Sequence, residues 1–161
     1  QRQRVWIAMA IAQAAEIMGG RGGLTDAQAA ALRDMFRRAF YPKLNQPSQW
    51  NGNVDLTQIE AMLAIAVFNE DQAEFRLGLE RLARRNPAYF YLASDAGKTR
   101  AIAGDGGNLQ HFWFQPVAWV DGLTQETCRD GGHHSQFGLG SALRAAIFAS
   151  SASSWAAGNG R

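Results

Sequence analysis

The chain has little of what marks several common classes of protein. Its 161 residues include one cysteine, Cys128, which excludes an internal disulfide framework and a zinc ribbon. The formal net charge is only +2, and no basic run with interleaved aromatic residues indicates a nucleic-acid surface. No uninterrupted apolar stretch is long enough to cross a bilayer, because residues 5–18 include Gln13 and Glu16. We therefore expect neither nucleic acid nor a membrane as a partner.

The beginning of the chain carries no visible secretory signal, and its first residue is a glutamine. This start is typical of a processed protein or of a portion excised from a longer one. The hydrophobic content of 47% is ample for the core of one domain of this length.

Apolar residues recur at helical spacing over most of the sequence, whereas the alternation typical of strands is scarce. The pattern predicts helices over residues 4–18, 54–69, 71–87 and 138–150, and one that runs from a capping box at residues 25–28 to a stop before Pro42. A short helix is expected near residues 115–122, inside a loop-rich segment, and the basic cluster at residues 81–85 fits the last turn of a helix. The fold class is all-α, and the recurring antiparallel helix pairs hint at a toroid or solenoid.

Residues 128–140 gather reactive side chains beside glycines, just before an apolar run. Arg129 offers a planar fork of donors that matches a carboxylate. His133 and His134 can move a proton near neutral pH. Together they indicate a site for an acidic substrate that undergoes proton transfer. The alternative is a glycine-rich helix entry with solvated polar side chains.

A second segment, Gln-Trp-Asn-Gly-Asn-Val-Asp-Leu at residues 49–56, directly precedes a predicted helix. With the later Arg-Asp-Gly-Gly-His at residues 129–133, it resembles the alginate lyase-like family of polysaccharide lyases. That family has an entry of the W-x-G-N type and a later R-D-x-G-H segment before G-L-G. The resemblance runs from about residue 4 to about residue 150. It implies that residues 1–161 form a single domain with the fold of an incomplete α/α toroid. Because members of the family are substantially longer, this domain would be only part of the toroid.

The resemblance implies a polysaccharide lyase that cleaves a uronic-acid-containing polymer, of the alginate or glucuronan type, by β-elimination without a metal or cofactor. In such a reaction, donors neutralise the uronate carboxylate, a base removes the C5 proton, and an acid protonates the departing oxygen. By resemblance Asn53 and Arg129 would serve the carboxylate, and His133 would share that duty or act as the base. The candidates for the tyrosine that commonly completes such sites are Tyr41, Tyr89 and Tyr91.

Other side chains near the two segments are candidates for contacts with the acidic polysaccharide. They are Trp50, Asn51, His111, Trp113, His134 and Gln136. Tryptophan offers a broad apolar face for a sugar ring, although packing in the core is the commoner role of this residue. His111 is either a core histidine or part of a groove wall.

Structural roles and other functions stay open beside this interpretation. Asn53 is well placed as the N-cap of the following helix, and Arg129 could pair with Glu126 or Asp130. A non-catalytic carbohydrate-binding or scaffold protein with the same fold is the principal alternative function. A metal-dependent hydrolase is a further one, but the spacing of its ligands, His111, His133, His134 and Cys128, matches no standard site. Since a polymer cannot readily enter a cell, we expect a secreted or periplasmic protein.

Overall fold

The structure is a computed structural model that describes residues 2–46, 48, 52–95, 113–130 and 132–152. Within these ranges it is mostly helical and contains no strand, only an isolated antiparallel bridge between Phe90 and Thr124. The all-α class is therefore confirmed, whereas the toroid stays a prediction. None of the helices in these ranges has both the length and the apolar character needed to span a bilayer.

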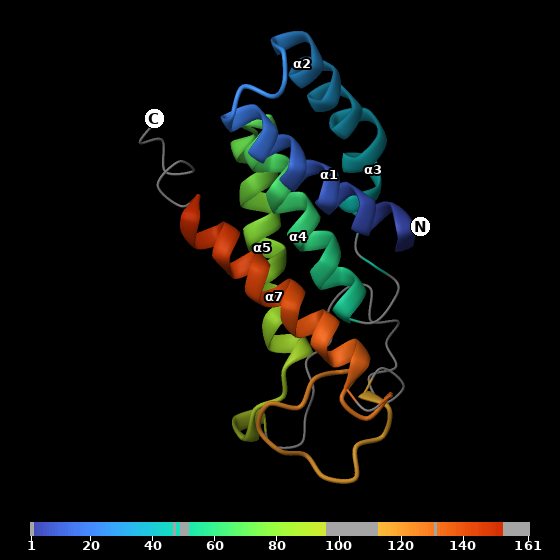
Figure 1. The fold of residues 1–161 in the computed structure, drawn as a ribbon. Coiled ribbons are helices and arrows are strands. Elements are labelled where there is room, and N and C mark those ends of the chain that lie inside the picture. Colours follow the sequence, from blue (N-terminus) through green and yellow to red (C-terminus); the bar gives the residue numbers. More distant parts are fainter. Residues whose placement is uncertain (1, 47, 49–51, 96–112, 131, 153–161) are drawn as a thin grey trace.

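Helix α4 (Gly52–Asn69) lies at the centre of the fold, and all of its residues except Val54 and Val67 are buried. It packs against α1 (Arg2–Gly20), α5 (Gln72–Tyr89) and α7 (His133–Ser151), as Figure 1 shows. A helix with neighbours on several sides needs apolar residues around most of its circumference. This explains why the sequence of α4 has hardly any polar face.

The predicted capping box is confirmed. The Thr25 hydroxyl accepts the backbone N–H of Gln28 at 3.3 Å, and the Gln28 side chain accepts the Thr25 N–H at 2.9 Å. The predicted stop before Pro42 is wrong. Helix α2 (Asp26–Met35) continues through a π-helical turn, Phe36–Phe40, into α3 (Tyr41–Leu44). Pro42 lies just after the π-helical turn, in the first turn of α3, a position at which proline is tolerated.

The helix predicted near residues 115–122 is absent from the described segment 113–130. Phe114 and Gln115 have φ values of 53° and 52°, in the left-handed region. Gln115 also precedes Pro116, whose ring disfavours the right-handed helical conformation in the residue before it. Helix α7 begins earlier than predicted, at His133, directly after Gly132 with a φ of 104°.

Two large apolar clusters and a small one make up the core. Phe36, Met62 and Phe68 belong to the cluster shared by α1, α4 and the π-helical turn. The second cluster lies between α4, α5 and α7 and includes Tyr89. The third is formed by Tyr91 and by residues of segment 113–130. The beginnings of α4 and α7, the end of α5 and this segment meet at one end of the molecule (Figure 1). That end carries the candidate site.

Candidate functional site

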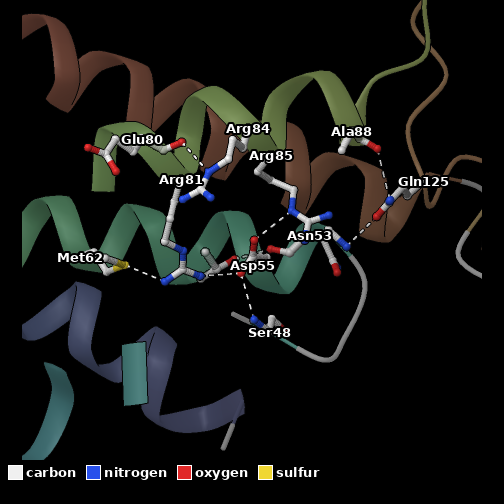
Figure 2. A network of polar contacts seen from close by, with 12 residues as sticks. Ser48, Asn53, Asp55, Met62, Glu80, Arg81, Arg84, Arg85, Ala88 and Gln125 are labelled. Carbon is white, nitrogen blue, oxygen red and sulfur yellow. Dashed lines mark hydrogen bonds and ion pairs between the residues drawn. The ribbon is translucent and has the colours of Figure 1, made fainter. Parts of the chain in front are cut away.

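The two segments that the sequence suggested as a pair meet at the first turn of α4. The Gln125 side chain accepts the N–H of Gly52 at 2.7 Å and donates to the carbonyl oxygen of Ala88 at 3.3 Å (Figure 2). The Glu126 carboxylate accepts the N–H of Asn53 at 3.4 Å. The first N–H groups of a helix have no partner within it, and the helix dipole favours a negative charge there. The later segment is thereby anchored to α4.

Asn53 lies inside the first turn of α4, because the helix begins at Gly52. The interpretation of Asn53 as the N-cap residue is therefore wrong. Its side chain is only 6% exposed, and its amide oxygen has no hydrogen-bond partner in the described part of the chain. Most buried polar side-chain atoms are paired. The stability of the helix therefore does not account for this unpaired oxygen.

Arg129 is half-buried, and its guanidinium carbon lies 5.5 Å from the centre of the Phe114 ring. Its backbone N–H donates to the carbonyl oxygen of Glu126 at 3.0 Å. The ion pair with Glu126 or Asp130 that the sequence left open does not form among the described residues. Among the described residues, the guanidinium thus has no carboxylate acceptor for its N–H donors.

His133 and His134 begin α7 and differ in their surroundings. His133 is exposed, and its ring lies edge-on to those of His134 and Phe137, at 5.3 and 5.2 Å between centres. His134 is partly buried, and its Nδ1 pairs with the carboxylate of Asp130. The hydrogen bond from His134 lowers the pKa of Asp130. His134 is thus held in place, and His133 is the imidazole that faces solvent.

Tyr89 is the candidate tyrosine that lies beside both segments. It is fully buried, and its ring lies so close to Gly52 and Gly138 that neither position has room for a Cβ. Burial, followed by the nearby charge of Glu126, raises the pKa of Tyr89 well above its usual value. Tyr89 therefore keeps its proton at neutral pH and is no ready base.

The other two tyrosines lie elsewhere. The Tyr41 hydroxyl accepts a hydrogen bond from Asn69 at 3.1 Å, and burial is the main cause that raises the pKa of Tyr41. Tyr91 is 4% exposed and packs in the small aromatic cluster with Trp113 and Trp119. The described structure thus supplies no exposed tyrosine to act beside Arg129.

The residues predicted to contact the polymer differ in their exposure, and some lie outside the described part of the chain. Trp113 is 1% exposed and lies 5.3 Å from the Trp119 ring, so it is a core residue with no free face for a sugar. Gln136 is exposed on the first turns of α7, close in sequence to His133. The remaining three, Trp50, Asn51 and His111, lie outside the described residues.

A buried charge network next to Asn53 was missed from the sequence. Asp55 accepts hydrogen bonds from Arg81 at 2.6 Å and from Arg85 at 2.9 Å, and the backbone N–H of Ser48 adds a third at 3.1 Å (Figure 2). The two arginines had been interpreted as cations of a helix end, but both are buried. A signal existed in the sequence, because an aspartate on the apolar face of a helix needs a buried partner. The network fixes α5 against the first turns of α4.

No three histidine, cysteine or acidic side chains cluster as metal ligands in the part of the chain that the structure describes. Comparison with known proteins finds no matching family model, no matching curated protein and no matching solved structure. The site is therefore interpreted from its own geometry.

Proposed function

We propose that the protein is a polysaccharide lyase that cleaves a uronic-acid-containing polymer, of the alginate or glucuronan type, by β-elimination. The observation that carries the proposal is the guanidinium of Arg129. It is partly exposed, has no carboxylate partner among the described residues and lies in the turn that leads to the exposed imidazole of His133. A cation and a group that exchanges protons, four residues apart in the chain, suit a substrate with a carboxylate and an acidic C–H.

In the proposed reaction, the N–H donors of Arg129 bind the uronate carboxylate and stabilise the charge that develops on it. Neutral His133 removes the C5 proton. The electron pair of that C–H bond forms the C4–C5 double bond while the bond from C4 to the glycosidic oxygen breaks. The departing oxygen takes a proton from the imidazolium just formed on His133.

Supporting roles follow from position. The amide of Asn53 joins Arg129 at the carboxylate, since the anchored turn and the first turn of α4 meet through Glu126. His134 and Gln136 contact neighbouring sugar hydroxyls. A substrate of this size places the protein outside the cytoplasm, as a secreted or periplasmic enzyme.

The experiment is an assay for unsaturated uronate ends on a panel of alginate, glucuronan and other acidic polymers, with the full chain. Removal of one donor to a developing oxyanion typically lowers kcat by about 10²–10³-fold, so we expect a loss of this order for Arg129→Ala. We expect a comparable or larger loss for His133→Ala. Arg76→Ala, at an exposed arginine of α5, is the matched control and should keep full activity. Binding of the polymers without any unsaturated product would refute the lyase.

The burial of Asn53 favours a second candidate function, a non-catalytic carbohydrate-binding or scaffold protein. Only 6% of Asn53 is exposed, so an amide predicted to touch the substrate is almost inaccessible. Such a protein would bind an acidic polymer through Arg129 and leave it intact. In that case Arg129→Ala would weaken binding, His133→Ala would leave binding unchanged, and no member of the panel would be cleaved.

A further inference from the structure

Arg129 is held by the face of an aromatic ring. Its guanidinium carbon lies 5.5 Å from the centre of the Phe114 ring. A cation within about 6 Å of an aromatic ring face is attracted by the quadrupole of the ring. Stacking uses the face of the guanidinium, whereas its N–H donors point outward in the plane of the group. This contact can therefore orient Arg129 and leave its donors unused.

The two acids nearest to Arg129 in sequence are engaged elsewhere. The carboxylate of Glu126 accepts the N–H of Asn53 at the beginning of α4. The carboxylate of Asp130 pairs with the His134 ring and also accepts the His134 N–H at 3.2 Å. Neither forms an ion pair with the Arg129 guanidinium in the described structure. The turn thus carries two carboxylates, and neither is an ion-pair partner of its arginine within the described ranges.

The backbone that presents Phe114 is unusual. Phe114 and Gln115 both have positive φ, 53° and 52°, which is uncommon for residues other than glycine and disfavoured for a bulky side chain. Such conformations persist only where the surrounding structure imposes them. The preceding residue, Trp113, is 1% exposed and packs on Tyr91 and Trp119. This anchor fixes the strained turn and with it the direction of the Phe114 ring.

We propose that Phe114 is a positioning residue that orients Arg129 through a cation–π contact, so that the site selects polymers with a carboxylate over neutral ones. The inference rests on the proposed function and extends it to the basis of substrate selection. An acidic partner would hold Arg129 equally well, but it would occupy the donors and repel the uronate. An aromatic partner holds the cation without occupying its donors and without repelling the uronate.

The test compares Phe114→Leu, which removes the ring, with Phe114→Tyr, which keeps it. The first readout is the NMR spectrum of the free protein, because a ring over the guanidinium shifts the side-chain resonances of Arg129 upfield. We expect this shift in the wild type and in Phe114→Tyr, and its loss in Phe114→Leu. Phe40→Leu is the control and should retain the upfield shift. This partly buried phenylalanine packs against the cluster shared by α1, α4 and the π-helical turn.

The second readout is affinity for acidic oligosaccharides cut from alginate, with neutral oligosaccharides of the same length beside them. We expect Phe114→Leu to bind the acidic ligand about two- to fivefold more weakly, the range that an exposed cation–π contact supports, and Phe114→Tyr to restore the affinity. Binding by Phe114→Leu equal to that of the wild type would overturn the inference, as would the absence of a ring-current shift in the wild type.

A titration with acetate separates this inference from the lyase itself. Acetate should perturb the Arg129 side-chain resonances of the wild type more strongly than those of Phe114→Leu. This result supports the role of Phe114 even for a protein that cleaves no polymer. Equal perturbation in the two proteins would contradict it, whatever the activity.

Discussion

The ring of Tyr89 occupies the space that a side chain on Gly138 would need, because a Cβ at that position would overlap the tyrosine hydroxyl. The same ring leaves no room for a Cβ on Gly52. Tyr89 ends α5, Gly52 begins α4, and Gly138 lies in α7. One buried side chain thus sets the approach of three helices at the end of the molecule that carries the candidate site.

Gly138→Ala should therefore destabilise the protein. Extra volume in a well-packed interior costs about 1–3 kcal/mol, and here it presses on a fully buried ring. The measurement is the free energy of unfolding from urea titration. The matched control is Gly140→Ala in the same helix, where a Cβ would come no closer than 3.1 Å to another side chain, that of Arg144. Alanine is the better helix former, so this control should be neutral or slightly stabilising. If both changes altered the free energy of unfolding to a similar extent, the Tyr89 ring would be able to move aside for the added Cβ.

Gln125→Ala should loosen the anchored turn. The Gln125 side chain accepts the N–H of Gly52 and donates to the carbonyl oxygen of Ala88. Its removal leaves a buried donor and a buried acceptor unpaired, and we expect a loss of about 1–3 kcal/mol in the free energy of unfolding. Amide hydrogen exchange at Gly52 should accelerate by a matching factor. Gln46→Ala, at an exposed glutamine, is the control and should change neither quantity. Unchanged exchange at Gly52 would contradict the anchor.

Much of the fold could be predicted because its determinants are local. The helical spacing of apolar residues and the capping box at Thr25 and Gln28 depend only on neighbours in the sequence. The errors have distant causes. Position 138 needs a glycine because the ring of Tyr89, far away in the sequence, fills the space of a Cβ there. The left-handed turn at Phe114 depends on the packing of Trp113.

The candidate site was predictable only as a set of residue types. Arg129 and His133 were found because their chemistry is distinctive in any setting. The bonds from Gln125 and Glu126 to the beginning of α4 join segments that are far apart in the sequence, and no local pattern encodes them. The environment of Asn53, inside a helix and almost fully buried, likewise follows from long-range packing.

Asp55→Asn should be strongly destabilising. The Asp55 carboxylate pairs with two guanidinium groups, those of Arg81 and Arg85, and all three side chains are buried. Removal of one partner from a buried ion pair costs about 3–5 kcal/mol, because the remaining charge stays without compensation. Asp34→Asn is the control, since Asp34 pairs with Arg38 on an exposed helix face. It should change the free energy of unfolding by about 0.5 kcal/mol or less. Equal effects of the two substitutions would show that the buried network contributes little.

Glu74 should make the stability of the protein depend on pH. Its side chain is buried, and one carboxylate oxygen accepts a hydrogen bond from Asn45 at 2.9 Å. The other oxygen has no hydrogen-bond partner among the described residues. Burial is the main cause that raises the pKa of Glu74 above the ordinary 4.5. The folded protein therefore binds this proton more tightly than the unfolded chain does.

The sign of the effect follows from this difference. The contribution of Glu74 to the free energy of unfolding is greatest below pH 4.5 and falls as the pH rises from there to the raised pKa of the folded state. Glu74→Gln carries no titrating proton, so its free energy of unfolding should decline less over this interval. The variant should gain on the wild type as the pH rises above 4.5, in urea titrations at several pH values. Glu80→Gln, at an exposed glutamate of the same helix, should follow the wild-type curve. If Glu74→Gln also followed it, the pH dependence would have to come from other carboxylates, and the buried carboxyl of Glu74 would be as well solvated in the folded protein as in the unfolded chain.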